Sequence, residues 1–157
     1  MAKVLIAYYS RTGNTKAMAK VIAGAIKAEG NSVDLKLVTN VKVPSLLNYD
    51  AIILGTPVYY GTMAAEVKKL IDASVKLHGQ LENTIGGAFA SSANIGGGNE
   101  TAITDIIHAF LIHGMIVRGD PEGDHYGPVS INRPNQRVIK NCRRFGKRIA
   151  LLLKKVK

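Results

Sequence analysis

The sequence predicts an α/β protein in which a doubly wound, five-stranded parallel sheet of strand order 2-1-3-4-5 forms the middle of three layers. Short apolar runs alternate with segments whose apolar residues recur at helical spacing, which is the pattern of a parallel sheet covered on both faces. Connections that are short and right-handed leave few other topologies. The length of 157 residues, of which 46% are hydrophobic, suits one domain over residues 1–157.

The first half of the chain supplies three of these strands. Residues 3–9 are apolar after Lys3 and predict the first strand. A polar turn follows, and then apolar side chains recur every three or four positions as far as Gly30, where we expect the helix to end. Residues 32–38 alternate and predict an edge strand, 44–48 form a connector or short helical turn, and the apolar run 51–55 is typical of a buried parallel strand.

The second half continues the alternation and ends in a long helix. In a sheet of this order, ligands bind at the carboxyl ends of the strands, where the strand order reverses, so loops 10–15, 56–62 and 91–99 are the candidate site. The remaining elements are expected as a helix over 62–77, a strand over 85–91, a helix over 99–113, a strand over 115–117, a loop over 118–130 and a helix that starts at Pro134.

The first of these loops has the composition of a phosphate site. Residues 10–15 read Ser-Arg-Thr-Gly-Asn-Thr and lie between a buried strand and a helix, where unpaired N–H groups and the helix dipole attract anions. No lysine follows the glycine as in a nucleoside-triphosphate loop, and a dinucleotide-binding Gly-x-Gly-x-x-Gly is absent. Taken alone, these residues are equally consistent with an ordinary polar turn.

The other two loops suit a flat ring. Tyr59 and Tyr60 follow a buried strand, and an aromatic face there can stack on a heteroaromatic ring, so we expect at least one tyrosine to face the ligand. Residues 96–98 are consecutive glycines, which make sense where the backbone must pass close to something flat or anionic. A flexible linker is the alternative, but a strand and a strongly periodic helix flank these glycines.

Longer segments resemble known families. Residues 49–63 resemble the central strand and flavin loop of NAD(P)H:quinone oxidoreductases of the Trp-repressor-binding-protein type, and residues 96–101 and 113–115 resemble two further signatures of that family. Residues 126–127 resemble a weaker fourth signature. Residues 10–15 instead resemble the phosphate loop of flavodoxins. The resemblance covers almost the whole chain, and it implies a flavodoxin-like fold that binds FMN.

Carried over to this sequence, the resemblance implies three sets of FMN-binding residues. It implies no certain catalytic residue, since the flavin carries the chemistry. In the resembling family, a histidine at this position lies near the flavin edge, which makes His113 a weak catalytic candidate. The alternative is a helix-terminal histidine beside carbonyl groups. The phosphate would be held by Ser10, Arg11, Thr12, Gly13, Asn14 and Thr15, the isoalloxazine lined by Pro57, Val58, Tyr59, Tyr60 and Gly61, and the pyrimidine end and ribityl chain covered by Ser91, Ser92, Ala93, Asn94, Ile95 and Gly96.

Three functions remain open at this point. The first is an FMN oxidoreductase that uses NAD(P)H and reduces quinones or similar acceptors. The second is a flavodoxin-type single-electron carrier, which residues 10–15 and the short chain favour. The third is a non-catalytic flavin-fold module that binds anionic partners through a basic C-terminal helix. We expect no metal, because the histidines have no ligand spacing with acidic residues or with one another.

The positive charge is concentrated at the C-terminus. The formal net charge is +10, and residues 133–157 contain ten Lys and Arg and no acidic residue. An apolar stripe from Val138 to Val156 that includes Cys142 predicts packing of the last helix on the sheet. The cations point to an acidic protein partner or to a solvated face, whereas nucleic acid is disfavoured and a homodimer is left open. A single cysteine and the lack of a signal peptide or membrane span lead us to expect a cytoplasmic protein.

Overall fold

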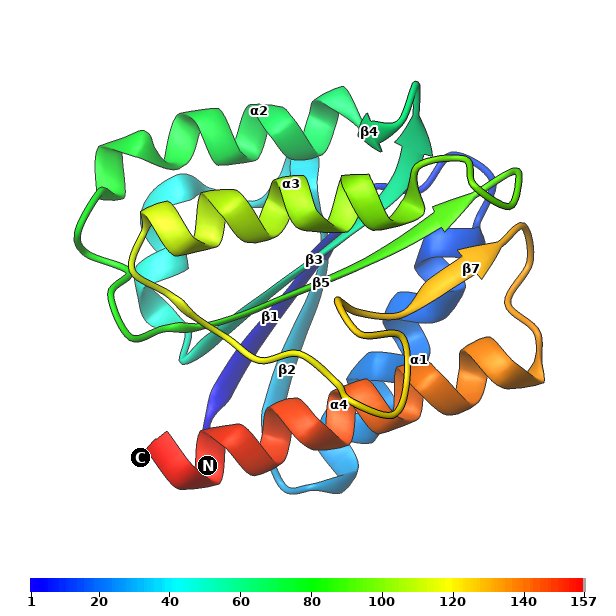
Figure 1. The fold of residues 1–157 in the computed structure, drawn as a ribbon. Coiled ribbons are helices and arrows are strands. Elements are labelled where there is room, and N and C mark those ends of the chain that lie inside the picture. Colours follow the sequence, from blue (N-terminus) through cyan, green and yellow to red (C-terminus); the bar gives the residue numbers. More distant parts are fainter. Residues whose placement is uncertain (157) are drawn as a thin grey trace.

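The computed structural model describes residues 1–156, which form a three-layered α/β fold around one seven-stranded sheet (Figure 1). The main strand order is β2-β1-β3-β5-β6, and β4 and β7 pair with β3 and β5. Helices α1 and α4 cover one face, and α2 and α3 cover the other. The strands are β1 (Lys3–Tyr8), β2 (Ser32–Leu37), β3 (Ala51–Tyr59), β4 (Thr62–Met63), β5 (Ile85–Ser92), β6 (Ile116–Val117) and β7 (Val129–Ile131), and the helices are α1 (Asn14–Ala28), α2 (Ala65–Ala73), α3 (Asn99–Ile112) and α4 (Gln136–Val156), with 3₁₀ turns at Val38–Asn40, Val43–Asn48 and Ser74–Leu77.

The predicted doubly wound fold is confirmed, but the fifth strand differs from the prediction. The expected strand over 115–117 is only the two-residue β6, which pairs with the start of β5. The chain then leaves the sheet and returns as β7, which pairs in parallel with Ala90–Ser92 at the other end of β5. Residues 118–130 are therefore not simply a loop. β7 could not be predicted from the sequence because it has only three residues, too few to show a periodicity.

The segment after the central strand was also expected to be a loop. Instead, β3 runs on to Tyr59 and turns back into β4, so that Tyr59 pairs with Thr62. The two turn residues, Tyr60 and Gly61, have φ angles of 48° and 81°, as a two-residue hairpin turn with two left-handed positions requires. Helix α2 consequently begins at Ala65, three residues later than predicted, and ends at Ala73, where a 3₁₀ turn takes over.

Helix α4 buries most of its predicted stripe against α1 and the sheet. Val138, Cys142 and Ile149 are buried, and burial raises the pKa of the Cys142 thiol to about 12. The helix starts at Gln136 and not at Pro134, because the Asn135 side chain accepts a hydrogen bond from the N–H of Val138 and caps it. Val156 is 46% exposed, so the predicted stripe was wrong at its last position.

Three glycines of the sheet make room for the three phenylalanines of the chain. Gly55 pairs directly with Phe89 across β3 and β5, and a Cβ on Gly55 would lie 2.1 Å from Cζ of Phe89. Gly86 and Gly87 of β5 accept the rings of Phe110 from α3 and Phe145 from α4, with built Cβ distances of 2.7 Å in both cases. Both helix layers are therefore fitted to the central strands by ring-to-backbone contact.

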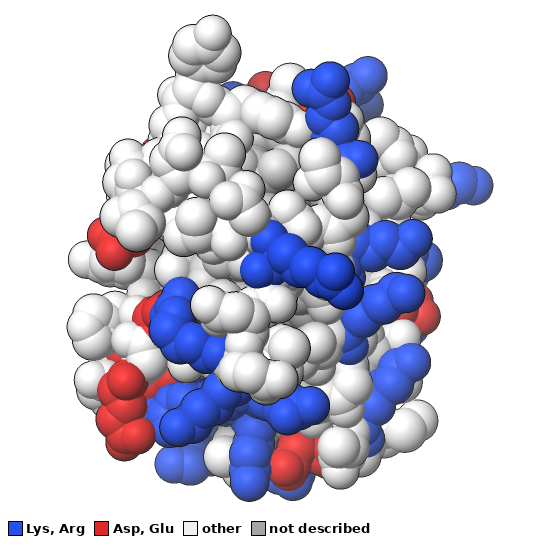
Figure 2. All heavy atoms as spheres, turned by 90° about the vertical axis from the view of Figure 1, so that its right-hand side faces the viewer, with Lys and Arg blue, Asp and Glu red and all other residues white. Residues whose placement is uncertain are grey.

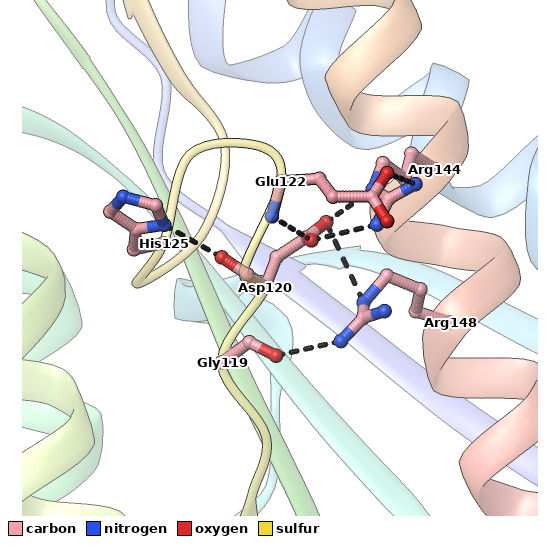
Figure 3. A network of polar contacts seen from close by, with 6 residues as sticks. All are labelled: Gly119, Asp120, Glu122, His125, Arg144 and Arg148. Carbon is pink, nitrogen blue, oxygen red and sulfur yellow. Dashed lines mark hydrogen bonds and ion pairs between the residues drawn. The ribbon is translucent and has the colours of Figure 1, made fainter.

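A polar network fastens the segment between β6 and β7 to α4 (Figure 3). The Asp120 carboxylate accepts two hydrogen bonds from Arg144, at 2.6 and 2.8 Å, and lies 3.5 Å from Nε of Arg148. Arg148 also donates to the Gly119 carbonyl at 2.7 Å. The hydrogen bonds from Arg144 hold the pKa of Asp120 well below its usual range, and burial opposes them. The loop expected over 118–130 is thus held against α4 by paired charges.

His113 lies far from the candidate loops. It follows α3 at the end opposite to loop 91–98, about 20 Å away for a helix of this length. The side chain is only 8% exposed, and its Nε2 lies 2.8 Å from Oγ of Ser74. Within residues 1–156, its Nδ1 has no hydrogen-bond partner. This placement corrects the weak assignment of His113 near the flavin and leaves it as a buried helix-terminal histidine.

Replacing Gly55 by alanine should destabilise the protein by about 1–3 kcal/mol, because the new methyl group overlaps the Phe89 ring. Gly24→Ala is the matched control, since a Cβ there meets nothing within 4 Å and the helical position favours alanine by up to about 1 kcal/mol. Equilibrium urea unfolding of the two variants measures both values. Equal effects of the two substitutions would contradict the packing described for β3 and β5.

The free energy of unfolding should fall as the pH is lowered below about 6.5, the pKa of an unfolded histidine. Burial, helped by the charge of His78, lowers the pKa of His113 in the folded protein, so the unfolded chain binds the proton more readily. The slope should not exceed that of one proton, about 1.4 kcal/mol per pH unit. Urea titrations between pH 5 and pH 8 (about the range of histidine titration) should show a weaker pH dependence in His113→Gln but not in the control His108→Gln.

Candidate cofactor site

The three predicted loops meet at the carboxyl edge of the sheet. Thr15 at the start of α1 and Ser91 at the end of β5 are both buried, and their hydroxyl oxygens lie 2.9 Å apart. Ser91 is also the pairing partner of Pro57 on β3. The first loop is thereby joined to the third, and the third to the second. Thr15 and Ser91 contribute these buried hydroxyls to the frame of the site rather than to its surface.

The turn over residues 10–13 leaves backbone donors open at the start of α1. Gly13 has a φ of 95°, and its N–H donates to Oγ of Ser10 at 3.1 Å, as does the N–H of Lys16 at 3.3 Å. The N–H groups of Asn14 and Thr15 have no acceptor among residues 1–156. Unpaired donors at the positive end of a fifteen-residue helix are what a phosphate group requires, so the residues present fit that group.

The hairpin between β3 and β4 is held against the start of α3. Thr101 donates a hydrogen bond to the Gly61 carbonyl, and Thr62 donates to the Asp105 carboxylate. Gly98 has a φ of 98°, and a Cβ on it would lie 2.5 Å from Cα of Gly61. Two of the three glycines can now be explained separately: Gly98 allows this close approach, whereas Gly96, with a φ of 67°, is required by the turn.

The third loop is hydrogen-bonded to the residue that follows β7, the strand that was not predicted from the sequence. Ser92 donates to the Asn94 carbonyl at 2.9 Å and closes the turn. Asn132, directly after β7, donates from its side chain to the Ala93 carbonyl at 3.1 Å and from its backbone to Ser92 at 2.8 Å. We did not select Asn132 from the sequence. The one signal in the sequence is the residue type, because asparagine adopts the left-handed conformation more readily than most residues, and Asn132 has a φ of 54°.

The two tyrosines of the hairpin lie in different surroundings. The Tyr60 side chain is fully exposed at the tip. Tyr59 is 37% exposed and lines a cleft of about 860 Å³ behind the hairpin, together with Tyr9 and Met63. The charge of Glu66 across this cleft raises the pKa of Tyr9. Of the predicted site residues, the cleft includes Arg11 and Tyr59.

The assembled site combines an anion cradle, an exposed aromatic side chain and closely approaching glycine backbone. Such a site can hold a phosphate at one end and cover a flat ring at the other. Within residues 1–156, no group of three or more His, Cys, Asp or Glu side chains is placed to hold a metal ion. In the same part of the chain, no helix is long and apolar enough to cross a membrane.

Comparison with known proteins finds the same fold and related sequences. A family model described as a flavodoxin domain matches residues 5–94. A flavodoxin of Clostridium saccharobutylicum is 35% identical over 98% of this chain and 99% of its own length. An NAD(P)H dehydrogenase (quinone) of Archaeoglobus fulgidus is 30% identical over 99% of this chain and 100% of its own length. A WrbA-like flavodoxin from Agrobacterium tumefaciens superposes with a TM-score of 0.85 over the full length of both chains, at 23% identity, and so supports the fold.

Proposed function

The chain belongs to the flavodoxin family of FMN redox proteins, and we propose that it is an NAD(P)H-dependent oxidoreductase that reduces quinones or similar acceptors. The observation that carries the FMN part of this proposal is the meeting of three loops at one sheet edge, with open N–H donors at the start of α1. FMN, when bound, supplies the transfer of electrons and hydride. The chain contributes binding, orientation and exclusion of water.

In this proposal each loop has its own part. The N–H groups of Asn14 and Thr15 and the hydroxyl of Thr12 donate to the phosphate, and Ser10 keeps the turn in shape. Residues 57–61 line the isoalloxazine, with Tyr60 stacked on the ring. Residues 91–96 cover the pyrimidine end and the ribityl chain. Thr15 and Ser91 act through their mutual hydrogen bond, which sets the spacing between the phosphate end and the ring end.

Two observations support different roles for the bound flavin. The segments 49–63 and 96–101 favour the reductase, as does the full-length match to the Archaeoglobus quinone dehydrogenase. The hydroxyl-rich residues 10–15 and the full-length match to the Clostridium flavodoxin favour the single-electron carrier, which is the second candidate. A cytoplasmic location is part of the same proposal, since the single cysteine, Cys142, is buried and free, as suits a reducing compartment.

Spectroscopy of the FMN-loaded protein separates these roles. We expect fluorescence quenching when FMN is titrated into the apoprotein, and rapid loss of the yellow colour on mixing with NADPH or NADH, without a second protein. Added quinone should restore the colour and sustain turnover. The flavin of a single-electron carrier would instead not be reduced by NADPH or NADH. During photoreduction its absorbance would change in two one-electron phases. Failure of FMN to bind would refute both roles.

Tyr60→Ala should weaken FMN binding by about 1 kcal/mol or more, through lost stacking and burial. Tyr60 stands free at the hairpin tip and can be covered by the ring, whereas Tyr59 already faces the cleft. Tyr59→Ala is therefore the matched control and should cost less affinity. Fluorescence titration of both variants with FMN gives the two values. A larger loss of FMN affinity for Tyr59→Ala than for Tyr60→Ala would show that Tyr59, and not Tyr60, stacks on the flavin.

A further inference from the structure

The basic C-terminal segment is brought to the same edge of the sheet as the three loops. Helices α1 and α4 pack side by side on one face of the sheet. Each helix follows a strand, β1 or β7, at its carboxyl end, so the first turns of both helices lie at the edge where the loops meet. Asn132 ties this arrangement to loop 91–98, which places Arg133 directly beside the candidate site.

Figure 2 shows the face of the molecule at the carboxyl edge of the sheet. Cations gather on the half of this face formed by α1 and α4, and the other half is largely uncharged. Arg137 and Arg144 are neutralised there, by Asp124 and by the carboxylates of Asp120 and Glu122. Five further cations are exposed and form no ion pair within residues 1–156. We call these five the basic rim, and they are Lys16, Lys20, Arg133, Lys140 and Arg143.

The uncharged half carries exposed apolar side chains. Tyr60 is fully exposed at the hairpin tip, and Ile95 is 89% exposed in loop 91–98. Both side chains belong to the loops that would surround the ring. An exposed apolar centre with charge to one side is the common layout of a protein-binding face, in which the centre gives affinity and the charges give orientation and rate.

We propose that the basic rim and the apolar loops form the docking face of an acidic electron-transfer protein, which donates electrons to the flavin. This inference rests on the proposed FMN function and adds the partner protein to NAD(P)H as a second source of electrons. In each encounter the reduced metal centre of the partner loses one electron and the flavin gains it. Two encounters deliver two electrons, and water supplies the protons. Docking beside Tyr60 and Ile95 would bring the partner against the part of the site where the isoalloxazine ring of FMN would be accessible.

Charge complementarity selects this partner. Five unpaired cations on one side of the site raise the local concentration of a negatively charged protein and speed its association by about ten- to a thousandfold at low salt. Nucleic acid is the less suitable polyanion, because no aromatic side chains are interleaved with the rim cations to stack on bases. The exposed aromatic Tyr60 stands on the uncharged half of the face.

The test uses a plant-type [2Fe–2S] ferredoxin of strongly negative charge as the probe. Calorimetry of the oxidised ferredoxin with this protein should detect binding at about 0.01 M salt, where charges act over about 30 Å, and little binding at about 1 M, where the range is about 3 Å. Stopped-flow mixing of reduced ferredoxin with the FMN-loaded protein should show electron transfer that slows with salt. Basic cytochrome c is the opposite probe and should react faster as salt is added.

A charge-reversed rim provides the variant. Lys20→Glu, Arg133→Glu and Lys140→Glu combined should weaken ferredoxin binding and slow electron transfer by about tenfold or more, without changing FMN affinity. The matched control is Lys27→Glu, Lys147→Glu and Lys155→Glu combined. It has the same net charge, but its residues lie 11 to 19 residues beyond the first residue of α1 or α4 at the site edge, so we expect about threefold or less.

The outcomes separate this inference from the proposed function. Lack of FMN uptake would refute the flavin function, whereas calorimetry of ferredoxin would still test the docking face. Equal losses for the rim and control variants would overturn the inference, since net charge alone would then explain binding. So would tighter binding to duplex DNA, or to vesicles containing phosphatidylserine, than to ferredoxin.

Discussion

The pairing of Gly55 with Phe89 is the constraint on which the rest of the structure depends. The aromatic ring occupies the space where a side chain on β3 would stand, so β3 and β5 fit together in one register. That register sets Pro57 beside Ser91, and Ser91 in turn meets Thr15 at the start of α1. A packing contact inside the sheet therefore decides how the three loops of the candidate site are spaced.

The division of the last strand into β6 and β7 serves the same site. Because β7 pairs with the end of β5, the residue that follows it, Asn132, can support loop 91–98 from beneath. Gly127 makes this return possible, since a Cβ on it would lie 2.0 Å from the Ala88 carbonyl oxygen. The ion pairs between Asp120 and α4 then hold the excursion between the two short strands against the helix.

Charge and binding geometry occupy neighbouring but separate parts of the molecule. The loops proposed to hold FMN carry hydroxyls, amides and glycines, with Arg11 as their cation. The basic rim stands on α1, on α4 and just before α4, where it can attract a partner without disturbing the cradle. Such a division lets affinity for the flavin and recognition of a redox partner vary independently, because different side chains carry each.

The sequence by itself determined the doubly wound sheet, the three candidate loops and the basic C-terminal helix. These follow from local patterns: continuous apolar runs, helical spacing, and hydroxyls and glycines directly after strands. Only the tertiary structure decided the extension of β3 into a hairpin, the existence of β7 and the burial of His113 beside Ser74. Each is fixed by contacts between residues distant in sequence: Thr101 with Gly61, Ser92 with Ile131, and Ser74 with His113. Periodicity reports which face of an element is buried, but long-range hydrogen bonds and ring-to-glycine contacts decide what it is buried against.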